Sequence, residues 1–327
     1  MRYIAYGADG TAASLHVAQA SAPVPDAGQV LNEVHCAGVN RPDIMQRQGH
    51  YPAPAGASPI LGLEVAGVIA ALGEGVRDWQ IGQPVCALVP GGGYADYCVT
   101  PAGQVLPLPA GFTMAQAAGL PEVWFTVWAN LVQMAHLGVG ERLLVHGGAS
   151  GIGLAALQLA RELGAEAVVT VGSPDKAQFC ERFGARAAID YRREDFAARI
   201  EQLYGGEGVD VVLDMIGAAY LSRNLRVLRR DGRLVFIAFQ QGSRAELDLR
   251  ELLARRLHLT GSAMRPRTVA EKTVIRDALR QRIWPALGEG RVRSHLHATF
   301  AMDEAREAHE LMERSAHIGK LVLRMRD

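Results

Sequence analysis

The stretch from residue 141 to residue 164 (ERLLVHGGASGIGLAALQLARELG) most constrains what this chain can fold into. It opens with an apolar run at residues 143–145, which predicts a buried parallel strand. A cluster of glycines follows, and then a run of good helix formers that ends at Gly164, a typical helix stop. Strand, glycine-rich turn and helix are the setting in which such a turn binds a dinucleotide, because N–H groups at the helix start donate to the pyrophosphate.

The glycine-rich turn follows the dinucleotide-binding pattern G-x-G-x-x-G with one departure. It reads Gly148, Ala149, Ser150, Gly151, Ile152 and Gly153. Ser150 stands where the pattern has its middle glycine, but its side chain is small and its hydroxyl can donate to a phosphate. The alternative is an ordinary tight turn; the strand and helix around it favour dinucleotide binding by these six residues.

Length and charge narrow the class of protein further. The chain has 327 residues, enough for about two domains. Lysine and arginine equal aspartate and glutamate at 34 each, so no overall charge favours nucleic acid or a membrane surface as a partner. The N-terminus lacks the apolar stretch of a signal peptide, and no apolar run is long enough to span a membrane.

The positions of the cysteines indicate the cellular compartment of the protein. The four cysteines are scattered without a C-x-x-C pair, at positions 36, 86, 98 and 180. This spacing suits buried thiols in a reducing compartment. We therefore predict a cytoplasmic protein.

Two kinds of secondary-structure pattern divide the chain. Residues 1–122 are rich in glycine, proline and short β-prone runs, typical of an irregular β domain. From residue 141, strands and helices alternate, which predicts an α/β fold with a doubly wound parallel sheet. Its predicted strands cover residues 143–145, 167–171, 209–214, 232–239 and 257–262. Helices at 268–283 and 302–314 and a strand at 319–325 complete the chain.

Several motifs then resemble one known family. They are AGVNRPD at 37–43, GLEVAG at 62–67, GGGYA at 91–95, the glycine-rich turn, and IGKLV at 318–322. Over essentially the whole chain they resemble the zinc-free quinone oxidoreductases of the medium-chain dehydrogenase/reductase superfamily. Residues 40–56 and the tail most resemble the branch of p53-inducible quinone reductase-like proteins.

The resemblance implies a fold of two domains. A GroES-like β-barrel catalytic domain would comprise residues 1–122 and 266–327, and a Rossmann cofactor domain residues 123–265. The substrate would bind in the cleft between them.

The motifs also bear on a metal site. Zinc-dependent relatives place a cysteine where this chain has Asn40 and a histidine where it has Leu63, and neither residue here is a zinc ligand. His295 and His297 could hold a metal with outside help, or be exposed strand histidines. We predict no functional metal. Without one, reduction of an electron-poor acceptor such as a quinone or an activated enone is favoured over alcohol oxidation.

The predicted cofactor is NADPH. An NAD-specific site usually carries an acid at the end of the second strand, where this chain has Gly172 and Ser173. Lys176 and Tyr191 match the family residues that close around the 2′-phosphate. The alternatives are a solvated lysine on a helix and a partly buried tyrosine.

Catalytic candidates come from the resemblance. Asn40 and Asp43 match active-site positions of the family, although Asp43 could instead hold its loop through an Asx-type bond. Tyr51 is an aromatic wall or hydroxyl donor, or a surface tyrosine in a mobile loop. Thr126 is expected on the nicotinamide side of the cofactor, and Trp124 in the core or the pocket.

Three further residues complete the predicted cofactor site. Phe239 and Gln240, at the predicted end of the fourth strand, are expected to bracket the nicotinamide. Lys320 lies near the cofactor or is simply exposed.

The resemblance as a whole implies an NADPH:quinone oxidoreductase with a small-molecule acceptor, forming a homodimer through the sheet edge near residues 257–262. One alternative is an NADPH-dependent enone or enoyl reductase on the same fold. Another is a non-enzymatic NADPH-binding sensor or RNA-binding protein, against which the absence of an aromatic-basic RNA motif weighs.

Overall fold

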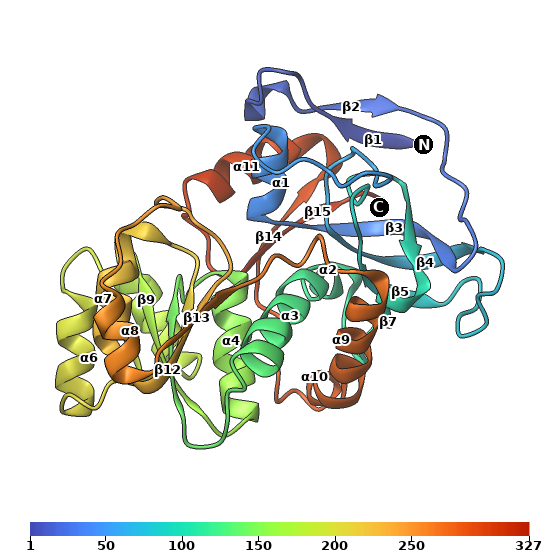
Figure 1. The fold of residues 1–327 in the computed structure, drawn as a ribbon. Helices are drawn as coiled ribbons and strands as arrows, with labels where there is room; N and C mark the ends of the chain where they lie inside the picture. The colour runs from blue at the N-terminus through green and yellow to red at the C-terminus, as the bar shows by residue number, and fades with distance from the viewer. Residues whose placement is uncertain (327) are drawn as a thin grey trace. The chain divides into compact units, whose positions relative to one another are not determined.

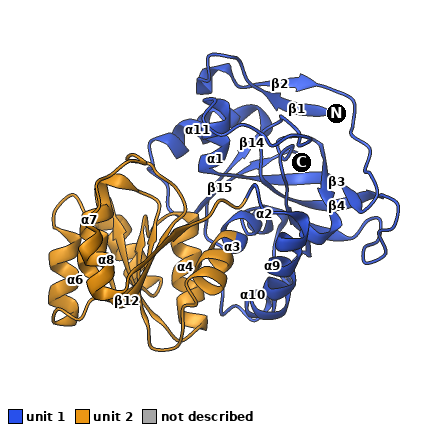
Figure 2. Cartoon of the chain, viewed as in Figure 1, with its two compact units in different colours: residues 1–125, 265–327 blue, residues 126–264 orange. Residues whose placement is uncertain are grey.

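The computed structural model describes residues 1–326 and divides into two compact units, coloured separately in Figure 2. One unit comprises residues 1–125 and the segment from residue 265 onward, and the other residues 126–264. This division lies close to the predicted domain bounds, while the function assigned to each domain stays a prediction. No helix within residues 1–326 is long and apolar enough to cross a membrane.

The first unit is built on a seven-stranded, mostly antiparallel sheet in the order β14-β15-β3-β4-β5-β7, with β6 paired to β3 off this path. The strands are β3 (Gln29–Val39), β4 (Glu64–Leu72), β5 (Pro84–Leu88), β6 (Tyr97–Pro101), β7 (Val105–Pro107), β14 (Leu296–Ala301) and β15 (Lys320–Arg324). β15 pairs antiparallel with β3, so the C-terminal segment completes the sheet that the N-terminal part begins. The GroES-like fold implied by the resemblance is confirmed.

Other elements of the first unit cover this sheet. β1 (Arg2–Ala5) and β2 (His16–Gln19) form a separate two-stranded sheet. The helices are α1 (Arg41–Arg47), α2 (Met114–Ala118), α9 (Val269–Arg282), α10 (Trp284–Gly288) and α11 (Ala305–Glu313). α11 buries Ala305, Ala308, His309 and Met312, which is the spacing of one helix face. Its apolar members pack into the core with Val34, Val65 and Leu321 of the sheet.

The chain leaves the first unit inside a continuous helical segment. α3 (Pro121–Val127) runs directly into a π-helix at Trp128–Met134. A π-helix of this kind is rare and often lies at a functional site.

The second unit is a six-stranded, fully parallel sheet in the order β10-β9-β8-β11-β12-β13, which confirms the doubly wound prediction. Its strands are β8 (Arg142–His146), β9 (Glu166–Val171), β10 (Ala187–Asp190), β11 (Val209–Asp214), β12 (Leu228–Phe236) and β13 (His258–Gly261). Its helices are α4 (Gly151–Glu162), α5 (Pro174–Arg182), α6 (Phe196–Tyr204), α7 (Leu221–Val227) and α8 (Leu249–Arg255). The strands read as continuous apolar runs because both faces are covered.

One face of this sheet packs against α6, α7 and α8. Leu144, Val168 and Val212 of the strands share a core cluster with Phe196 of α6 and Leu225 of α7. Figure 1 shows α4 on the other side of the sheet. The chain moves outward from β8 through β9 to β10 and then returns to β11, which is paired with β8. In doubly wound sheets, ligands bind at the carboxyl ends of the two strands where the order reverses in this way.

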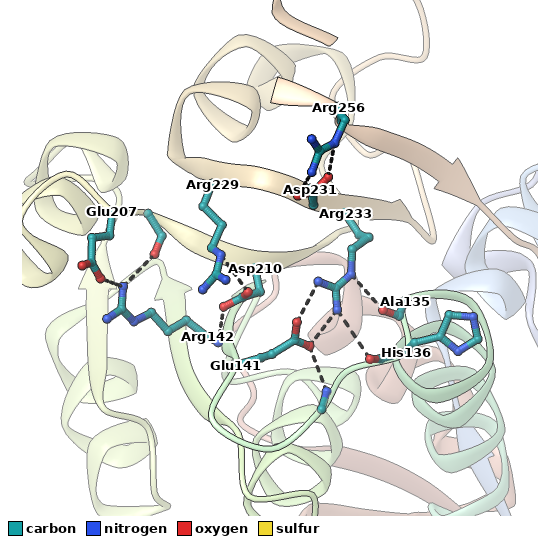
Figure 3. A network of polar contacts seen from close by, with 12 residues as sticks. Ala135, His136, Glu141, Arg142, Glu207, Asp210, Arg229, Asp231, Arg233 and Arg256 are labelled. Carbon is teal, nitrogen blue, oxygen red and sulfur yellow. Dashed lines mark hydrogen bonds and ion pairs between the residues drawn. The ribbon is translucent and has the colours of Figure 1, made fainter. Parts of the chain in front are cut away.

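The opposite, amino-terminal edge of the sheet is closed by ion pairs (Figure 3). Arg233 of β12 donates from its two terminal nitrogens to the carboxylate of Glu141, at 2.8 and 2.7 Å. Its Nε also donates to the carbonyl of Ala135, just after the π-helix, at 2.9 Å. Asp210, at the start of β11, accepts from the backbone N–H of Arg142 at 2.8 Å and pairs with the guanidinium of Arg229 at 3.1 Å. These contacts tie the strand starts together.

Two predicted elements are corrected by the structure. β12 ends at Phe236 and not at Phe239, because the segment that follows bonds to the loop after β11. There, the N–H groups of Gln240 and Gln241 donate to the carbonyls of Met215 and Ile216, at 3.1 and 2.8 Å. β12 is also the fifth strand of the sheet along the chain, since the sequence patterns missed the short strand β10. The segment around Asp43, expected above to be a loop, is helix α1.

Candidate cofactor and active-site residues

The glycine-rich turn joins β8 to α4 and is shaped by close backbone packing. A Cβ on Gly153 would lie 2.3 Å from the carbonyl oxygen of Gly148, and one on Gly148 would lie 2.3 Å from Cβ of Val169. Glycine is therefore required at both positions. Ser150 is the N-cap of α4, since its hydroxyl oxygen accepts from the N–H of Gly153 at 3.1 Å. The hydroxyl proton of Ser150 stays available to donate to a phosphate.

The turn lies at the point where the strand order reverses. A Cβ on Gly147, the first residue after β8, would lie 2.8 Å from the sulfur of Met215, the first residue after β11. The loops after these two strands are thus in contact. Of the other predicted residues in the turn, Ala149 is buried, and Gly151 and Ile152 are half-buried in the first turn of α4.

The end of β9 gathers positive charge and lacks an acid. A Cβ on Gly172 would lie 2.6 Å from the hydroxyl of Tyr191, so this glycine makes room for the tyrosine. Ser173 caps α5 by accepting from the N–H of Lys176 at 3.3 Å. Burial, and then the charge of Arg192, lower the pKa of Lys176. Tyr191 exposes 41% of its surface. Binding of a 2′-phosphate by Lys176 and Tyr191 stays a prediction. Sequence reasoning gave no role to Arg192, although it follows Tyr191 directly.

A buried polar chain crosses the carboxyl ends of β8, β9 and β11. His146 contacts the hydroxyl of Thr170 at 2.9 Å and Oδ1 of Asn224 at 2.7 Å. The amide nitrogen of Asn224 donates to Asp214 at 3.0 Å, and Asp214 accepts from the N–H groups of Ile216 and Gly217. Burial lowers the pKa of His146 to about 4 and raises that of Asp214 to about 6. This series of hydrogen-bonded side chains holds the loop after β11 in place.

Phe239 and Gln240 depend on that same loop. The segment carrying them is bonded to residues 215–218, and Phe239 exposes 55% of its surface with its ring 5.7 Å from that of Phe236. The two residues therefore lie at the carboxyl edge of the sheet. Their role in bracketing the nicotinamide stays a prediction.

In the first unit, Asn40 belongs to a buried triad with Glu64 and Lys320. Nζ of Lys320 lies 2.6 Å from Oε1 of Glu64 and donates to Oδ1 of Asn40 at 2.6 Å and to the carbonyl of Val39 at 3.4 Å. The amide nitrogen of Asn40 donates to the same Glu64 oxygen at 2.9 Å. Lys320 is 6% exposed, so the alternative of an exposed lysine is wrong. Its cofactor role stays a prediction, because its three N–H groups already have acceptors within the first unit.

Asp43 starts a second buried chain. Its Oδ2 accepts from the N–H of Asn40 at 2.8 Å and from the hydroxyl of Tyr94 at 3.3 Å. Its Oδ1 accepts from the N–H of Gly62 at 3.1 Å. Burial raises the pKa of Asp43 to about 7, although the two backbone donors oppose this rise. These contacts give Asp43 the structural role weighed above, while a catalytic role stays a prediction.

The series of hydrogen bonds that starts at Asp43 continues through Tyr94 to α11. Nε2 of His309 lies 3.2 Å from the hydroxyl of Tyr94, and its Nδ1 lies 3.0 Å from a terminal nitrogen of Arg47. Because Arg47 can only donate, Nδ1 accepts and Nε2–H donates to Tyr94. Arg47 also pairs with Glu313. No sequence pattern signalled His309, Tyr94 or Glu64 as a site residue, although Tyr94 and Glu64 lie inside motifs that carry the family resemblance.

Tyr51 lies beside positive charge in the first unit. The guanidinium of Arg265 lies 5.4 Å from the centre of the Tyr51 ring, and one of its nitrogens donates to the Tyr51 carbonyl at 3.4 Å. Arg265 is held in turn by the carbonyl of Pro90 at 2.9 Å. Burial, and then the negative charge of Glu122, raise the pKa of Tyr51.

The two remaining candidates lie in α3. Trp124 is 1% exposed and so belongs to the core, one of the two positions weighed for it. Thr126 is 9% exposed, and its carbonyl accepts from the side chain of Asn130 in the π-helix at 2.8 Å. Asn130 also accepts from the hydroxyl of Ser262 at 2.9 Å. The predicted contact between Thr126 and the nicotinamide stays a prediction.

The positions of the zinc ligands in metal-dependent relatives are engaged otherwise. Leu63 is 3% exposed, and the amide of Asn40 is bound to Glu64 and Lys320. Among residues 1–326, no group of three or more histidine, cysteine, aspartate or glutamate side chains is arranged to hold a metal. His297 is exposed and His295 half-buried, with the His297 ring 6.3 Å from that of His317.

Comparisons with known proteins agree with this architecture. A model of the alcohol dehydrogenase GroES-like domain matches residues 26–110, and a model of the zinc-binding dehydrogenase family matches residues 151–279. Quinone oxidoreductase of Rattus norvegicus is 30% identical over 303 residues, 92% of this chain and 90% of the relative. A phenolphthiocerol/phthiocerol polyketide synthase of Mycobacterium tuberculosis is 30% identical over 95% of this chain. The chain spans only 14% of that relative's length.

Two solved structures share the fold over nearly the whole chain. Escherichia coli quinone oxidoreductase complexed with NADPH has a TM-score of 0.88 and 28% identity, covering 99% of this chain and 100% of that one. CurK enoyl reductase has a TM-score of 0.86 and 28% identity, covering 99% of each chain. Fold and similarity together define an oxidoreductase of the medium-chain dehydrogenase/reductase type. Within that superfamily, the chain belongs to the quinone oxidoreductase family.

Proposed function

We propose that this protein is an NADPH-dependent, metal-free reductase of quinones. The observation that carries the proposal is the triad of Asn40, Glu64 and Lys320, together with the buried Leu63. Asn40 and Leu63 occupy positions where zinc-dependent relatives bind their metal, and Asn40 is bound by the other two members of the triad instead. Without a metal to polarise a carbonyl, the acceptor must already be electron-poor.

The cofactor is NADPH. Its pyrophosphate would be held by the N–H groups of the turn at residues 148–153 and by the hydroxyl of Ser150. Its 2′-phosphate would be held by Lys176 and Tyr191, with Arg192 adding charge and Gly172 leaving space. When bound, it supplies a hydride to the acceptor.

The residues of the chain position the reactants and stabilise charge. The loop carrying Phe239 and Gln240 is fixed by Asp214 and so offers a defined surface at the carboxyl edge of the sheet. Tyr51, held against Arg265, offers an aromatic face and a hydroxyl to the acceptor. Thr126 lies at the end of α3 as a further polar group. We assign these roles on the family resemblance and on the geometry of each unit taken separately.

The second candidate function is reduction of an activated enone or enoyl thioester. The similarity to CurK enoyl reductase and to a polyketide synthase favours it. Quinones and enones both take a hydride and are left with a negatively charged oxygen, so the residues described above serve either acceptor.

A steady-state screen separates these functions. Ortho-quinones, para-quinones, simple enones and an enoyl thioester would each be supplied with NADPH and with NADH. We expect turnover of quinones with NADPH to exceed turnover of the other acceptors. Faster turnover of the enoyl thioester would reassign the enzyme, and no turnover of any acceptor would leave the non-enzymatic alternatives.

We also propose that the enzyme is a cytoplasmic homodimer. β13 is the last strand of its sheet, and an unpaired sheet edge is a liability unless it is covered. A second copy could pair with β13 across a two-fold axis. Light scattering at micromolar concentration should give twice the chain mass of 35.1 kDa, and a monomer would contradict the proposal.

A further inference from the structure

One carboxylate beside the buried triad has no partner. Glu122 is the second residue of α3, and its backbone N–H donates to Oε2 of Glu64 at 2.9 Å. Its side chain is half-buried and makes no hydrogen bond or ion pair with any residue of the described chain, 1–326. Neither carboxylate oxygen of Glu122 is among the fully buried side-chain atoms that lack a partner, so water reaches the group. An unpaired acid that water reaches, next to predicted catalytic residues, is able to exchange a proton both with solvent and with a bound molecule.

Five charged groups interact electrostatically with Glu122. Glu64 of β4 and Asp43 of α1 are acidic, while Lys320 of β15, Lys272 of α9 and Arg265, which precedes α9, are basic. Burial, and then the charge of Glu64, raise the pKa of Glu122 to about 8, and the two lysines act against that rise. At neutral pH, Glu122 is therefore mostly a protonated acid, which is the state that a proton donor needs.

One predicted catalytic residue lies on the same helix as Glu122, and another feels its charge. After burial, the negative charge of Glu122 contributes to the raised pKa of Tyr51 in the first unit. Thr126 follows Glu122 by four residues in α3, so the two share one face of that helix. Glu122 thus stands among residues expected to meet the acceptor.

The other acids and cations nearby are already engaged. Both oxygens of Asp43 accept hydrogen bonds from Asn40, Gly62 and Tyr94. The three N–H groups of Lys320 are directed to Glu64, Asn40 and Val39. Nζ of Lys272 donates to the carbonyl of Arg265 at 3.0 Å. Glu122 is the acid of this cluster that has no competing contact.

We propose that Glu122 is a catalytic residue that donates the proton taken up by the reduced acceptor; this inference rests on the reductase function proposed above. The acceptor gains a hydride, which carries two electrons, and its displaced electron pair comes to rest on oxygen. A new O–H bond forms there as the O–H bond of the Glu122 acid breaks. The resulting carboxylate then recovers a proton from water, so one proton is consumed for each hydride.

The test compares Glu122→Gln, Glu122→Asp and the exposed control Glu307→Gln with the native chain. In the absence of cofactor, infrared spectra at neutral pH should lose a protonated-carboxyl C=O band in Glu122→Gln and keep it in Glu307→Gln. With NADPH and a quinone, kcat should fall roughly 10²- to 10⁴-fold in Glu122→Gln, the usual contribution of a general acid. The native decline in kcat above about pH 8 should vanish in Glu122→Gln and persist, at reduced rate, in Glu122→Asp.

Several results would overturn the proposal. The proposal fails if the native enzyme turns over a quinone and Glu122→Gln is equally active. It also fails if kcat of Glu122→Gln still declines above pH 8, or if the infrared band is still present in that variant. If circular dichroism and NADPH affinity show that Glu122→Gln does not fold, Glu122→Asp becomes the test. A kcat of Glu122→Asp that does not decline above about pH 8 would then refute the role. If the native enzyme reduces no acceptor, the proposed function fails separately, while the infrared band still reports whether Glu122 is protonated.

Discussion

At the residue scale, Lys176 should decide between the two nicotinamide cofactors. The 2′-phosphate is present only in NADPH, and a charge-assisted hydrogen bond to it contributes on the order of 1.5–3 kcal/mol. Lys176→Ala should therefore raise the KM for NADPH roughly ten- to hundredfold. The KM for NADH and both kcat values should change little, because the contact is remote from the reacting atoms.

Steady-state kinetics with both cofactors and one quinone measure this effect. Arg182→Ala, an exposed cation on the same helix α5, is the matched control and should leave both KM values unchanged. Equal changes for NADPH and NADH in Lys176→Ala, or no change for either, would show that Lys176 does not bind the phosphate.

A second residue-scale prediction concerns acid stability and His146. Burial lowers its pKa from 6.5 to about 4 in the folded chain. Below pH 6.5 the unfolded chain binds a proton that the folded chain refuses, so stability is lost as pH falls towards about 4. Since one pKa unit corresponds to about 1.4 kcal/mol, the loss from this group is roughly 3 kcal/mol.

Denaturant unfolding at a series of pH values measures the free energy of unfolding directly. His146→Gln keeps a polar side chain but cannot be protonated, so its stability should fall less between pH 6.5 and pH 4. His16→Gln, at an exposed position, should follow the native curve. Parallel curves for the native chain and His146→Gln would rule out His146 as the source.

At the scale of elements, the ion pair between Arg233 and Glu141 should stabilise the second unit. It is two-pronged and partly buried, and Arg233 also binds the carbonyl of Ala135 beyond the π-helix (Figure 3). Arg233→Ala leaves Glu141 without its partner, which should cost about 1–3 kcal/mol. The exposed pair of Arg250 and Asp248 is the control, and Arg250→Ala should cost less than about 1 kcal/mol. Equal shifts in the urea midpoint would show that the Arg233 contacts add no more than a surface pair.

At the scale of the whole molecule, we predict that the enzyme works without zinc. The two positions that would supply ligands carry Asn40 and Leu63, and both are engaged in the first unit. Protein purified without added metal should contain well below one zinc per chain by elemental analysis, and chelator should leave activity unchanged. Stoichiometric zinc whose removal abolishes turnover would contradict this prediction.

Local sequence patterns predicted those parts of the molecule that depend on local physics. The turn at residues 148–153 requires glycine because its own backbone and a neighbouring strand leave no room for a Cβ. The apolar runs of β8, β9 and β11 predict buried parallel strands, because a strand covered on both faces needs apolar side chains along its whole length. Family resemblance implied only that the C-terminal segment belongs to the first domain. The antiparallel pairing of β15 with β3 came from the structure, since no local pattern reveals a pairing between residues so far apart.

Only the tertiary structure decided which polar side chains meet. Glu64 and Lys320 are 256 positions apart in sequence and become a buried ion pair because β15 pairs with β3 and β3 with β4. His309 joins Asp43 through Tyr94 for a similar reason, and Arg192 joins Lys176 because β10 lies beside β9. The strand predicted to reach Phe239 stops at Phe236 because its continuation bonds to the loop after β11. Such contacts depend on strand pairing between distant segments, and the charge and spacing of residues along the sequence do not predict that pairing.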